Sequence, residues 1–337
     1  MVDKSEKRET VMTGLKREWL RQAVVSKFFL LCILRIIQNY QQGGRLLLGL
    51  RDADTGSTHR DFSLDQSVEY IHKCFERYKR LAGIESFHGK AAEVGPGDSC
   101  GVALLLLEYG CSRVDLVDRF RSRYNAQQQA MINQRLMELH PSLNLRCKDK
   151  SYTEESFIGI ERHIGRKNAA EVFFKENGPY DLIVSMSVIQ HLYDPGIAIR
   201  RMAEQLKTGG KMVHRIDLRD QGFFSRYFEE MKFLEVPDWV YPHMTRFTGR
   251  SNRWRVSQFL DVCNASGLSS QMFVTRVAGG GELPQPVQWE DIPIPERERA
   301  LAYVRLRRPL FATSLRSLSD EDLAITGIEV VSTKPLL

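Results

Sequence analysis

The segment that begins at Lys90 constrains the fold of this chain more than any other. Its sequence, KAAEVGPGDSCGVALLLLEYGCSRVDLVDRF, predicts in order a buried strand (Ala91–Val94), a glycine turn, a helix with Val102 to Leu107 on its buried side, and a second strand (Val114–Val117). Asp98 or Ser99 can cap this helix, which we expect to end at Gly110. Strand, turn, helix and strand in this order form the unit of a parallel sheet covered by helices.

The turn of this unit has the features of a nucleotide-binding site. Gly95 and Gly97 let the backbone approach a ligand, and the carboxylate of Asp118 at the next strand end can accept hydrogen bonds from both ribose hydroxyls. The nicotinamide fingerprint GxGxxG would need glycine at position 100, where this chain has Cys100. Glu93 gives E-x-G-x-G instead, and its carboxylate would repel a pyrophosphate but suits the sulfonium and amino group of S-adenosylmethionine (SAM). The sequence favours SAM over NAD, although a glycine pair alone is also typical of a tight turn.

The second half of the chain continues the alternation of strands and helices. The predicted elements are strands at Tyr180–Ser187, Lys211–Ile216, Ser269–Val277 and Ile325–Ser332, helices at Gly196–Leu206 and Val256–Ser266, and a turn at LKTGGK. This alternation predicts an α/β fold with a doubly wound, mostly parallel sheet.

Four segments, in this order and spacing, resemble the class I SAM-dependent methyltransferases, which have a Rossmann-like fold. They are E-x-G-x-G at Glu93–Gly97, the acidic strand end at Asp118, YDLIVSMSVIQHLYDP, and LKTGGKMV. The resemblance covers about Gly89 to Val331 and implies seven strands, the last one antiparallel and placed between its neighbours. A narrower resemblance, carried by HRIDLRDQ and WVYPHMTRFTGRSNRWR, is to a bacterial subgroup of uncharacterised methyltransferases.

The family resemblance also implies roles for individual residues. The methionine end of SAM would contact Glu93, Gly95 and Gly97, and its ribose would contact Asp118. Asn168 and Ala169 would lie next to the adenine, and Ser185 and Ser187 would lie under the methyl group. Asn168 stands where the family usually has an acidic residue, so any contact there would be made by an amide.

Methyl transfer from SAM requires a positioned acceptor and a group that takes its proton. His191, His214 and Asp217 follow or end predicted strands and are the candidates, with Asp220 in the loop beyond. His191 opens the next helix and can instead be structural. His214 and Asp217 are three residues apart, so on a strand they face opposite sides, and Asp217 is the better candidate because it is nearer the loop.

An insertion over about residues 219–256 is expected to cover the acceptor. It carries four candidate substrate-binding residues, His243, Arg246, Arg250 and Arg253, and has no Asp or Glu between Trp239 and Arg255. A basic and aromatic cap suggests an acceptor with a phosphate or carboxylate and a ring, such as a nucleotide-linked or lipid-linked sugar. The alternative is a solvated loop whose arginines pair with acids elsewhere.

The N-terminal extension, residues 1–60, holds most of the net charge of +6. It has 11 Lys and Arg against 6 Asp and Glu, a balance of +5, while the other 277 residues have 37 against 36. A helix is predicted from about Leu15 to Gln42, with no apolar run long enough to cross a bilayer and no cleaved secretory signal. One interpretation is that this helix packs on the body or on a second subunit. The other is that it lies on a membrane, where Arg17, Arg21, Lys27 and Arg35 would contact lipid phosphates and Phe28–Ile37 would enter the acyl boundary.

These features predict three regions: the extension, a helical lead-in over residues 61–88, and a SAM-binding methyltransferase domain over residues 89–337. The expected function is O-methylation of a hydroxyl on a glycan, a nucleotide- or lipid-linked sugar or another small metabolite, since no NPPY-like segment of exocyclic-amine methylating enzymes follows Ser185. An RNA methyltransferase, disfavoured by the near-neutral body, and a non-catalytic scaffold are the alternatives.

Six scattered cysteines without a CxxC pair indicate a reducing, cytoplasmic compartment and no metal site. The extension makes attachment to the inner face of the membrane an option. The sequence is also compatible with a homodimer.

Overall fold

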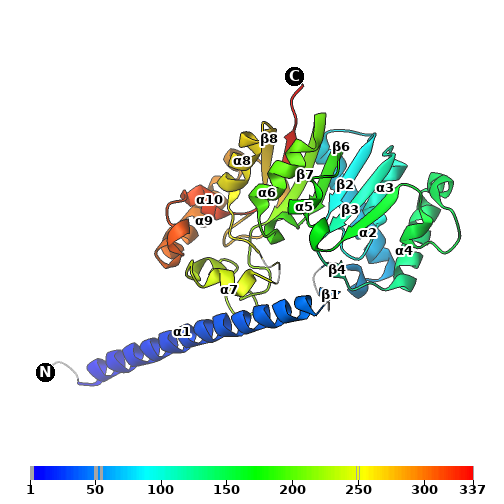
Figure 1. Ribbon diagram of the computed structural model, residues 1–337. Coiled ribbons are helices and arrows are strands. Elements are labelled where there is room, and N and C mark those ends of the chain that lie inside the picture. Colours follow the sequence, from blue (N-terminus) through cyan, green and yellow to red (C-terminus); the bar gives the residue numbers. More distant parts are fainter. Residues whose placement is uncertain (1–3, 49–51, 54–55, 248, 250, 337) are drawn as a thin grey trace.

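A mixed sheet of eight strands runs through the centre of the molecule, with helices on both faces (Figure 1). The computed structural model describes residues 4–48, 52–53, 56–247, 249 and 251–336, and of residues 4–24 and 52–53 it describes the backbone alone. Neighbouring strands follow the order β5-β3-β2-β6-β7-β10-β8-β9. The strands are β2 (Lys90–Val94), β3 (Arg113–Asp118), β5 (Ile160–Ile164), β6 (Tyr180–Met186), β7 (Leu206–Asp217), β8 (Ser269–Val277), β9 (Glu282–Val287) and β10 (Ile325–Thr333).

The strand directions confirm the predicted topology. β5, β3, β2, β6 and β7 pair in parallel, whereas β10 is antiparallel to both β7 and β8 and lies between them. The predicted sheet lacked β9, which pairs antiparallel with β8 at the edge. The sequence of β9, ELPQPV, contains two prolines, and such a segment is tolerated only at the edge of a sheet.

The helices cover the sheet in two layers, and alternate residues of each strand face one layer or the other. Ala91 of β2 packs with α2, α3 and α4, and its neighbour Ala92 packs with α5, α6 and α8. Two further helices, α9 and α10, lie between β9 and β10 in the chain and pack into the second layer. The helices of the body are α2 (Leu64–Ala82), α3 (Gly101–Glu108), α4 (Ala126–Leu139), α5 (Ala170–Phe173), α6 (Pro195–Glu204), α8 (Val256–Ala265), α9 (Ile294–Arg307) and α10 (Asp320–Ala324).

Two local predictions differ from the structure. The segment LKTGGK is part of β7 and not a turn, because its backbone pairs with the chain end at Lys334, whose carbonyl accepts from the N–H of Gly209 at 2.8 Å. The N-terminus of α3 has no side-chain cap. The Ser99 hydroxyl accepts from the N–H of Gly101, and the Asp98 carboxylate binds a different segment, described below.

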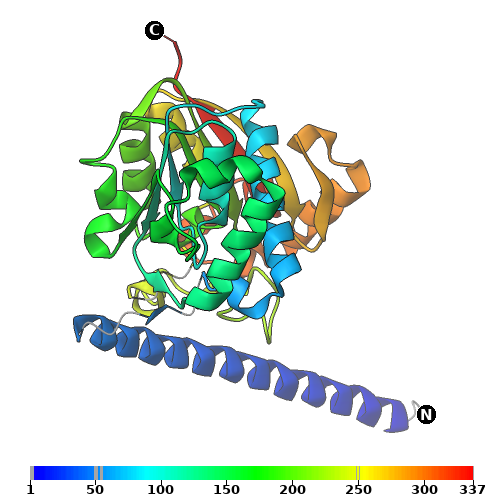
Figure 2. The same cartoon turned by 90° about the vertical axis from the view of Figure 1, so that its right-hand side faces the viewer.

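The N-terminal helix α1 (Lys4–Leu47) is longer than predicted and passes through Gly43 and Gly44. Figure 2 shows it running along one side of the molecule. Its described inner side packs on the insertion after β7, which we call the cap (residues 219–255) and which contains the short helix α7 (Tyr241–Thr245). Asn39 of α1 donates to the carbonyl of His243 at 2.8 Å and accepts from the N–H of Phe247 at 2.7 Å.

These contacts confirm that α1 packs on the body and correct the predicted lipid contacts. Arg35 donates to the carbonyls of Gly222 and Phe223, and Phe28 packs on Phe224, so neither points away from the protein. Lys27 lies over the ring of Tyr227, 4.4 Å from its centre. The side chains of Arg17 and Arg21 lie outside the described part. Within that part, no helix has the length and apolar character needed to cross a membrane.

Candidate cofactor and acceptor site

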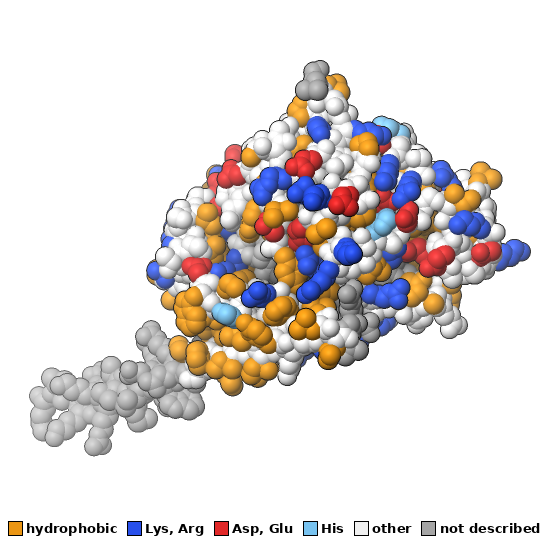
Figure 3. Space-filling view, in the orientation of Figure 1, with side chains coloured by type: hydrophobic (Ala, Val, Ile, Leu, Met, Phe, Trp, Pro, Cys, Tyr) orange, Lys and Arg blue, Asp and Glu red, His pale blue; other side chains and the backbone are white. Residues whose placement is uncertain are grey.

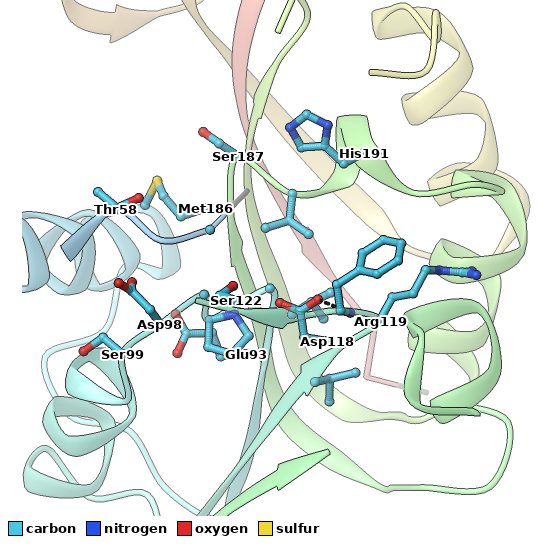
Figure 4. Close-up of a pocket in the computed structure, with 18 of the residues that line it drawn as sticks. Thr58, Glu93, Asp98, Ser99, Asp118, Arg119, Ser122, Met186, Ser187 and His191 are labelled. Atoms are coloured by element: carbon cyan, nitrogen blue, oxygen red, sulfur yellow. Dashed lines mark hydrogen bonds between the residues drawn. The ribbon is translucent and has the colours of Figure 1, made fainter. Parts of the chain in front are cut away.

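A cavity of about 380 Å³ opens at the carboxyl ends of β2, β3 and β6. Parallel sheets of this topology bind their ligands at this edge. The walls of the cavity are the glycine turn after β2, the loop after β3, the loop after β6, one side of α2, and residues 56–62, which we call the strap. In the view of Figure 4, Glu93 and Asp118 lie on one side of the cavity, and Ser187 and His191 lie on the other.

Two buried carboxylates give the cavity its electrostatic character. Burial raises the pKa of Glu93 to about 8 and that of Asp118 to about 6. The Asp118 carboxylate accepts from the N–H of Phe120 at 3.0 Å, and the Glu93 carboxylate forms no ion pair with any described side chain. The two groups would therefore be stabilised by a ligand that brings positive charge and hydroxyl donors, as SAM does.

The glycines of the turn are required by the protein's own packing. Gly95 and Gly97 have φ values of +72° and +67°. A Cβ atom on Gly95 would lie 2.3 Å from the side chain of Val188, and one on Gly97 would lie 2.4 Å from the carbonyl oxygen of Gly56 in the strap. The strap thus lies directly on the glycine turn, in a contact that the sequence motif does not reveal.

Arg162 of β5 supports the turn from the protein side. Its guanidinium donates to the carbonyls of Gly97 at 2.9 Å and Ser99 at 3.2 Å, and it pairs with Glu154 at 2.7 Å. Such a fixed group holds the backbone of the turn in one position below the cavity.

The strap brings His59 into the site, a residue that sequence reasoning missed. The carboxylate of Asp98 accepts from the backbone N–H groups of His59 at 3.4 Å and Arg60 at 3.2 Å, so Asp98 fixes the strap and does not cap α3. His59 lines the cavity with 4% of its surface exposed, and its Nδ1 has no hydrogen-bond partner within the described chain. Burial lowers the pKa of His59 to about 4, which keeps the ring neutral at pH 7.

The residues predicted to contact adenine lie one to two positions before the residues that line the cavity. Asn168 and Ala169 do not line the cavity; the Asn168 amide donates to the carbonyl of Ile164 at 3.0 Å. The following residues, Ala170 and Glu171, do line it.

Of the two residues predicted to form the floor under the methyl group, Ser187 lines the cavity and Ser185 does not. Ser185 is fully buried, and its hydroxyl is hydrogen-bonded to Nδ1 of His214 at 2.8 Å. Ser187, two residues further on, lines the cavity and has a φ of +56°. A non-glycine residue in this left-handed region is uncommon and places the Ser187 backbone at the turn that ends the strand.

Of the four candidate proton acceptors, His191 alone lines the cavity. His214 is buried and does not line the cavity, and burial lowers the pKa of its ring to about 4. Asp217 pairs with Arg219 at 2.6 Å, so its pKa lies below the usual value although burial alone would raise it. Asp220 accepts from the backbone N–H groups of Phe223, Phe224 and Ser225 and organises the start of the cap.

The described substrate-binding residues predicted in the cap, His243, Arg246 and Arg253, do not line the cavity. Arg253 donates to the carbonyl of Val236 and pairs with Asp238, both at 2.7 Å, and His243 meets the hydroxyl of Tyr40 on α1 at 2.9 Å. Arg246 is exposed beside Phe247, and Arg250 lies outside the described residues. Arg253 therefore fits the alternative in which the cap arginines pair with groups elsewhere. The described cap residues that line the cavity are Gln221 and Gly249.

The acceptor side of the cavity is polar and carries little charge. Among the described lining residues, Arg119 is the one Lys or Arg, and it pairs with Glu171 at 3.1 Å and lies over Tyr193. The uncharged polar side chains on this side are those of Thr58, Tyr70, Ser187 and Gln221, and His59 and His191 also line the cavity.

The fold and the site together define a class I SAM-dependent methyltransferase, with SAM as its cofactor. Residues 67–259 match the family model described as a methyltransferase domain, and the chain belongs to this family. A search of curated proteins gave no match.

Solved structures with a similar fold are distant in sequence. The YcgJ protein from Bacillus subtilis is 13% identical, with 79% of this chain and 100% of that one covered and a TM-score of 0.40. Phosphoethanolamine N-methyltransferase 2 from Haemonchus contortus, in complex with SAM, is 16% identical, with 79% and 53% covered and a TM-score of 0.40. A putative sarcosine dimethylglycine methyltransferase from Galdieria sulphuraria is 14% identical, with 86% and 96% covered and a TM-score of 0.41.

Proposed function

We propose that this enzyme transfers the methyl group of SAM to a hydroxyl group of a small acceptor, with a sugar or another hydroxylated metabolite as the acceptor class. The observation that carries this proposal is the set of neutral hydrogen-bonding side chains on the acceptor side, from Thr58, Ser187 and Gln221, beside two histidines. A hydroxylated acceptor finds donors and acceptors there, whereas an anionic group finds no described cation other than the paired Arg119. The acceptor is therefore proposed without the phosphate or carboxylate that the cap sequence suggested.

Glu93 and Asp118 are the proposed cofactor-binding carboxylates. SAM carries a methyl group on a positively charged sulfonium, which makes the methyl carbon electrophilic. Glu93 has a raised pKa, and a neighbouring positive charge would favour its ionised form. Asp118 ends β3, where its carboxylate can accept hydrogen bonds from ribose hydroxyls, and Ala170 and Glu171 line the adjoining wall.

The two histidines have separate proposed roles. His191 is the candidate for taking the proton of the acceptor hydroxyl, because it is the predicted base that lines the cavity. His59 is the proposed positioning residue, because its neutral ring lines the cavity from the strap and can fix the place of the acceptor. His214 and Asp217 are no longer candidates, because Ser185 and Arg219 hold them outside the cavity.

The first test is calorimetry of S-adenosylhomocysteine binding to the intact chain, with NAD as the control ligand. Micromolar binding of S-adenosylhomocysteine without a response to NAD would support the site, and sugars and other polyols would then be screened by following S-adenosylhomocysteine release from SAM. Turnover with amines but with no hydroxyl acceptor would contradict the proposal. Cofactor binding without turnover on any acceptor would favour the non-catalytic scaffold.

An RNA acceptor is a weaker candidate on the same observations. RNA binding needs several cations that can reach phosphates, and Arg253 of the cap is engaged by Val236 and Asp238. RNA affinity that falls steeply with added salt would restore this candidate.

A further inference from the structure

The side of α1 that faces away from the body is an apolar surface without a partner in the described chain. We call it the outer face, and its members are Phe29, Leu30, Ile33, Leu34 and Ile37. Phe29 is 66% exposed, Leu30 56% and Ile37 48%, which is unusual for side chains of this size so close together. Figure 3 shows hydrophobic side chains gathered along the described part of α1 at the lower edge of the molecule.

The helical period separates this face from the packed side. Phe28, Cys32, Arg35 and Asn39 recur at spacings of four, three and four and contact the body. At about 100° per residue, the outer-face residues cover an arc on the other side of the helix. The polar Gln38 lies off this arc, and the cations Lys27 and Arg45 lie at its margin.

The charge of the helix indicates what covers this face. Between Glu18 and Asp52 the sequence has no acidic residue, whereas it has five cations, namely Arg21, Lys27, Arg35, Arg45 and Arg51. A second copy of α1 would bring the same positive charges against Lys27 and Arg45. An anionic lipid surface would attract them, and an apolar face bordered by basic residues is typical of a helix that lies in a membrane interface.

We propose that the outer face of α1 docks this enzyme on an anionic lipid bilayer, with the helix in the plane of the interface. The aromatic ring of Phe29 and the branched side chains of Ile33 and Ile37 enter the boundary between headgroups and acyl chains. The inner side of α1 stays on the cap through Asn39. This arrangement narrows the predicted lipid contacts: within Phe28–Ile37, Phe28 and Arg35 hold the body, and the outer-face residues meet the lipid.

The docked orientation also places the cavity near the membrane. Figure 1 shows that α1 runs beneath the end of the body where β1 (Asp52–Ala53) and β4 (Arg121–Ser122) pair. Ser122 lines the cavity, and so does Gly249, two residues beyond Phe247, which contacts α1. On the proposed function, an acceptor hydroxyl carried on a membrane-anchored molecule would approach from this side.

The test is sedimentation of the full-length protein with vesicles of phosphatidylcholine alone and of phosphatidylcholine mixed with phosphatidylglycerol. We expect binding to the anionic vesicles that weakens as salt is added, because salt screens the attraction. The double variant Ile33→Glu/Ile37→Glu should bind at least about tenfold more weakly, since it removes two apolar side chains from the interface and adds charges of the lipid's own sign.

Two further variants separate the face from the rest of the helix. Gln42→Glu adds a negative charge about 80° around the helix from Leu34, the nearest outer-face residue, so binding should stay within about twofold of the parent protein. Arg45→Glu changes an exposed residue at the margin of the outer face. It should weaken binding to the anionic vesicles and leave binding to phosphatidylcholine vesicles unchanged. Thermal unfolding of each variant checks that the body is intact.

Two results would overturn the proposal. One is an intact protein that sediments with neither kind of vesicle. The other is a dimer in ultracentrifugation that Ile33→Glu/Ile37→Glu converts to a monomer without any change in vesicle binding, which would assign the face to self-association. Neither result depends on methyl transfer, so the proposed function stands or falls separately.

Discussion

The cavity and the cap use their charged residues in opposite ways. In the cavity, Glu93 is a buried carboxylate that forms no ion pair with a described side chain, and burial raises its pKa. In the cap, Arg253 is half-buried, and its guanidinium is bound by two protein partners, the Val236 carbonyl and the Asp238 carboxylate. In sequence, both Glu93 and the arginines of the cap are candidate binding residues, and the sequence does not show which of them already have a protein partner. A charge is available to a ligand only where the fold leaves it without a protein partner.

The largest expected effect comes from removing the carboxylates of the cavity. Glu93→Ala and Asp118→Ala should each weaken S-adenosylhomocysteine binding about 100-fold or more, because buried donors of the ligand would lose a charged acceptor. The matched control is Asp217→Asn, a strand-end carboxylate that already pairs with Arg219, and its affinity should stay within about twofold of the parent. Calorimetry measures all three. An equal loss in the control would break the distinction between paired and unpaired carboxylates.

The converse change in the cap should affect stability and not binding. Arg253→Met leaves Asp238 and the Val236 carbonyl without their donor and should cost about 2 kcal/mol of unfolding free energy. Denaturant titration measures the cost, and calorimetry should find the cofactor affinity unchanged. A stable variant with weakened cofactor or acceptor binding would instead return Arg253 to the site.

The pH dependence of SAM binding tests the state of Glu93. The pKa of Glu93 is raised to about 8 without ligand, so below pH 8 the carboxyl is mostly protonated, and a cationic ligand must displace that proton. Affinity should therefore rise with pH up to about 8, by at most about tenfold per pH unit for this one group, and level off above it. Glu93→Gln should lose that rise. The same slope in the variant would assign the proton to another group, with Asp118 the next candidate at a pKa of about 6.

The smallest effect on cofactor binding is expected at His59. His59→Gln should change S-adenosylhomocysteine affinity by about twofold or less, because the ring is assigned to the acceptor. Once an acceptor is found, the same variant should raise KM or lower kcat about tenfold, while its pH profile keeps the slope of the parent, since a neutral ring that only positions the acceptor does not titrate in that range. A lost limb of the pH profile would make His59 the proton acceptor.

Sequence patterns predicted the parts of this molecule that are determined locally. The strand Tyr180–Met186 is a continuous apolar run, and Asp118 ends β3 as the pattern requires. A parallel sheet then brings the ends of β2, β3 and β6 to one edge without further information.

The missed features depend on contacts between distant segments. His59 enters the cavity because Asp98, 39 residues later, holds the strap. His214 leaves it because Ser185 of the neighbouring strand binds its ring. LKTGGK extends β7 because the chain end near Lys334 pairs with it. None of these partners lies within the reach of a local pattern.

The contact between Gly56 and Gly97 makes the residue types at two distant positions of the chain depend on each other. The carbonyl oxygen of Gly56 occupies the space that any side chain at position 97 would need. A Cβ at position 56 would in turn meet the hydroxyl of Ser122 at 2.6 Å. We therefore expect these three positions to change together. Loss of the strap would remove the steric limit at position 97, but its φ of +67° would still favour glycine there.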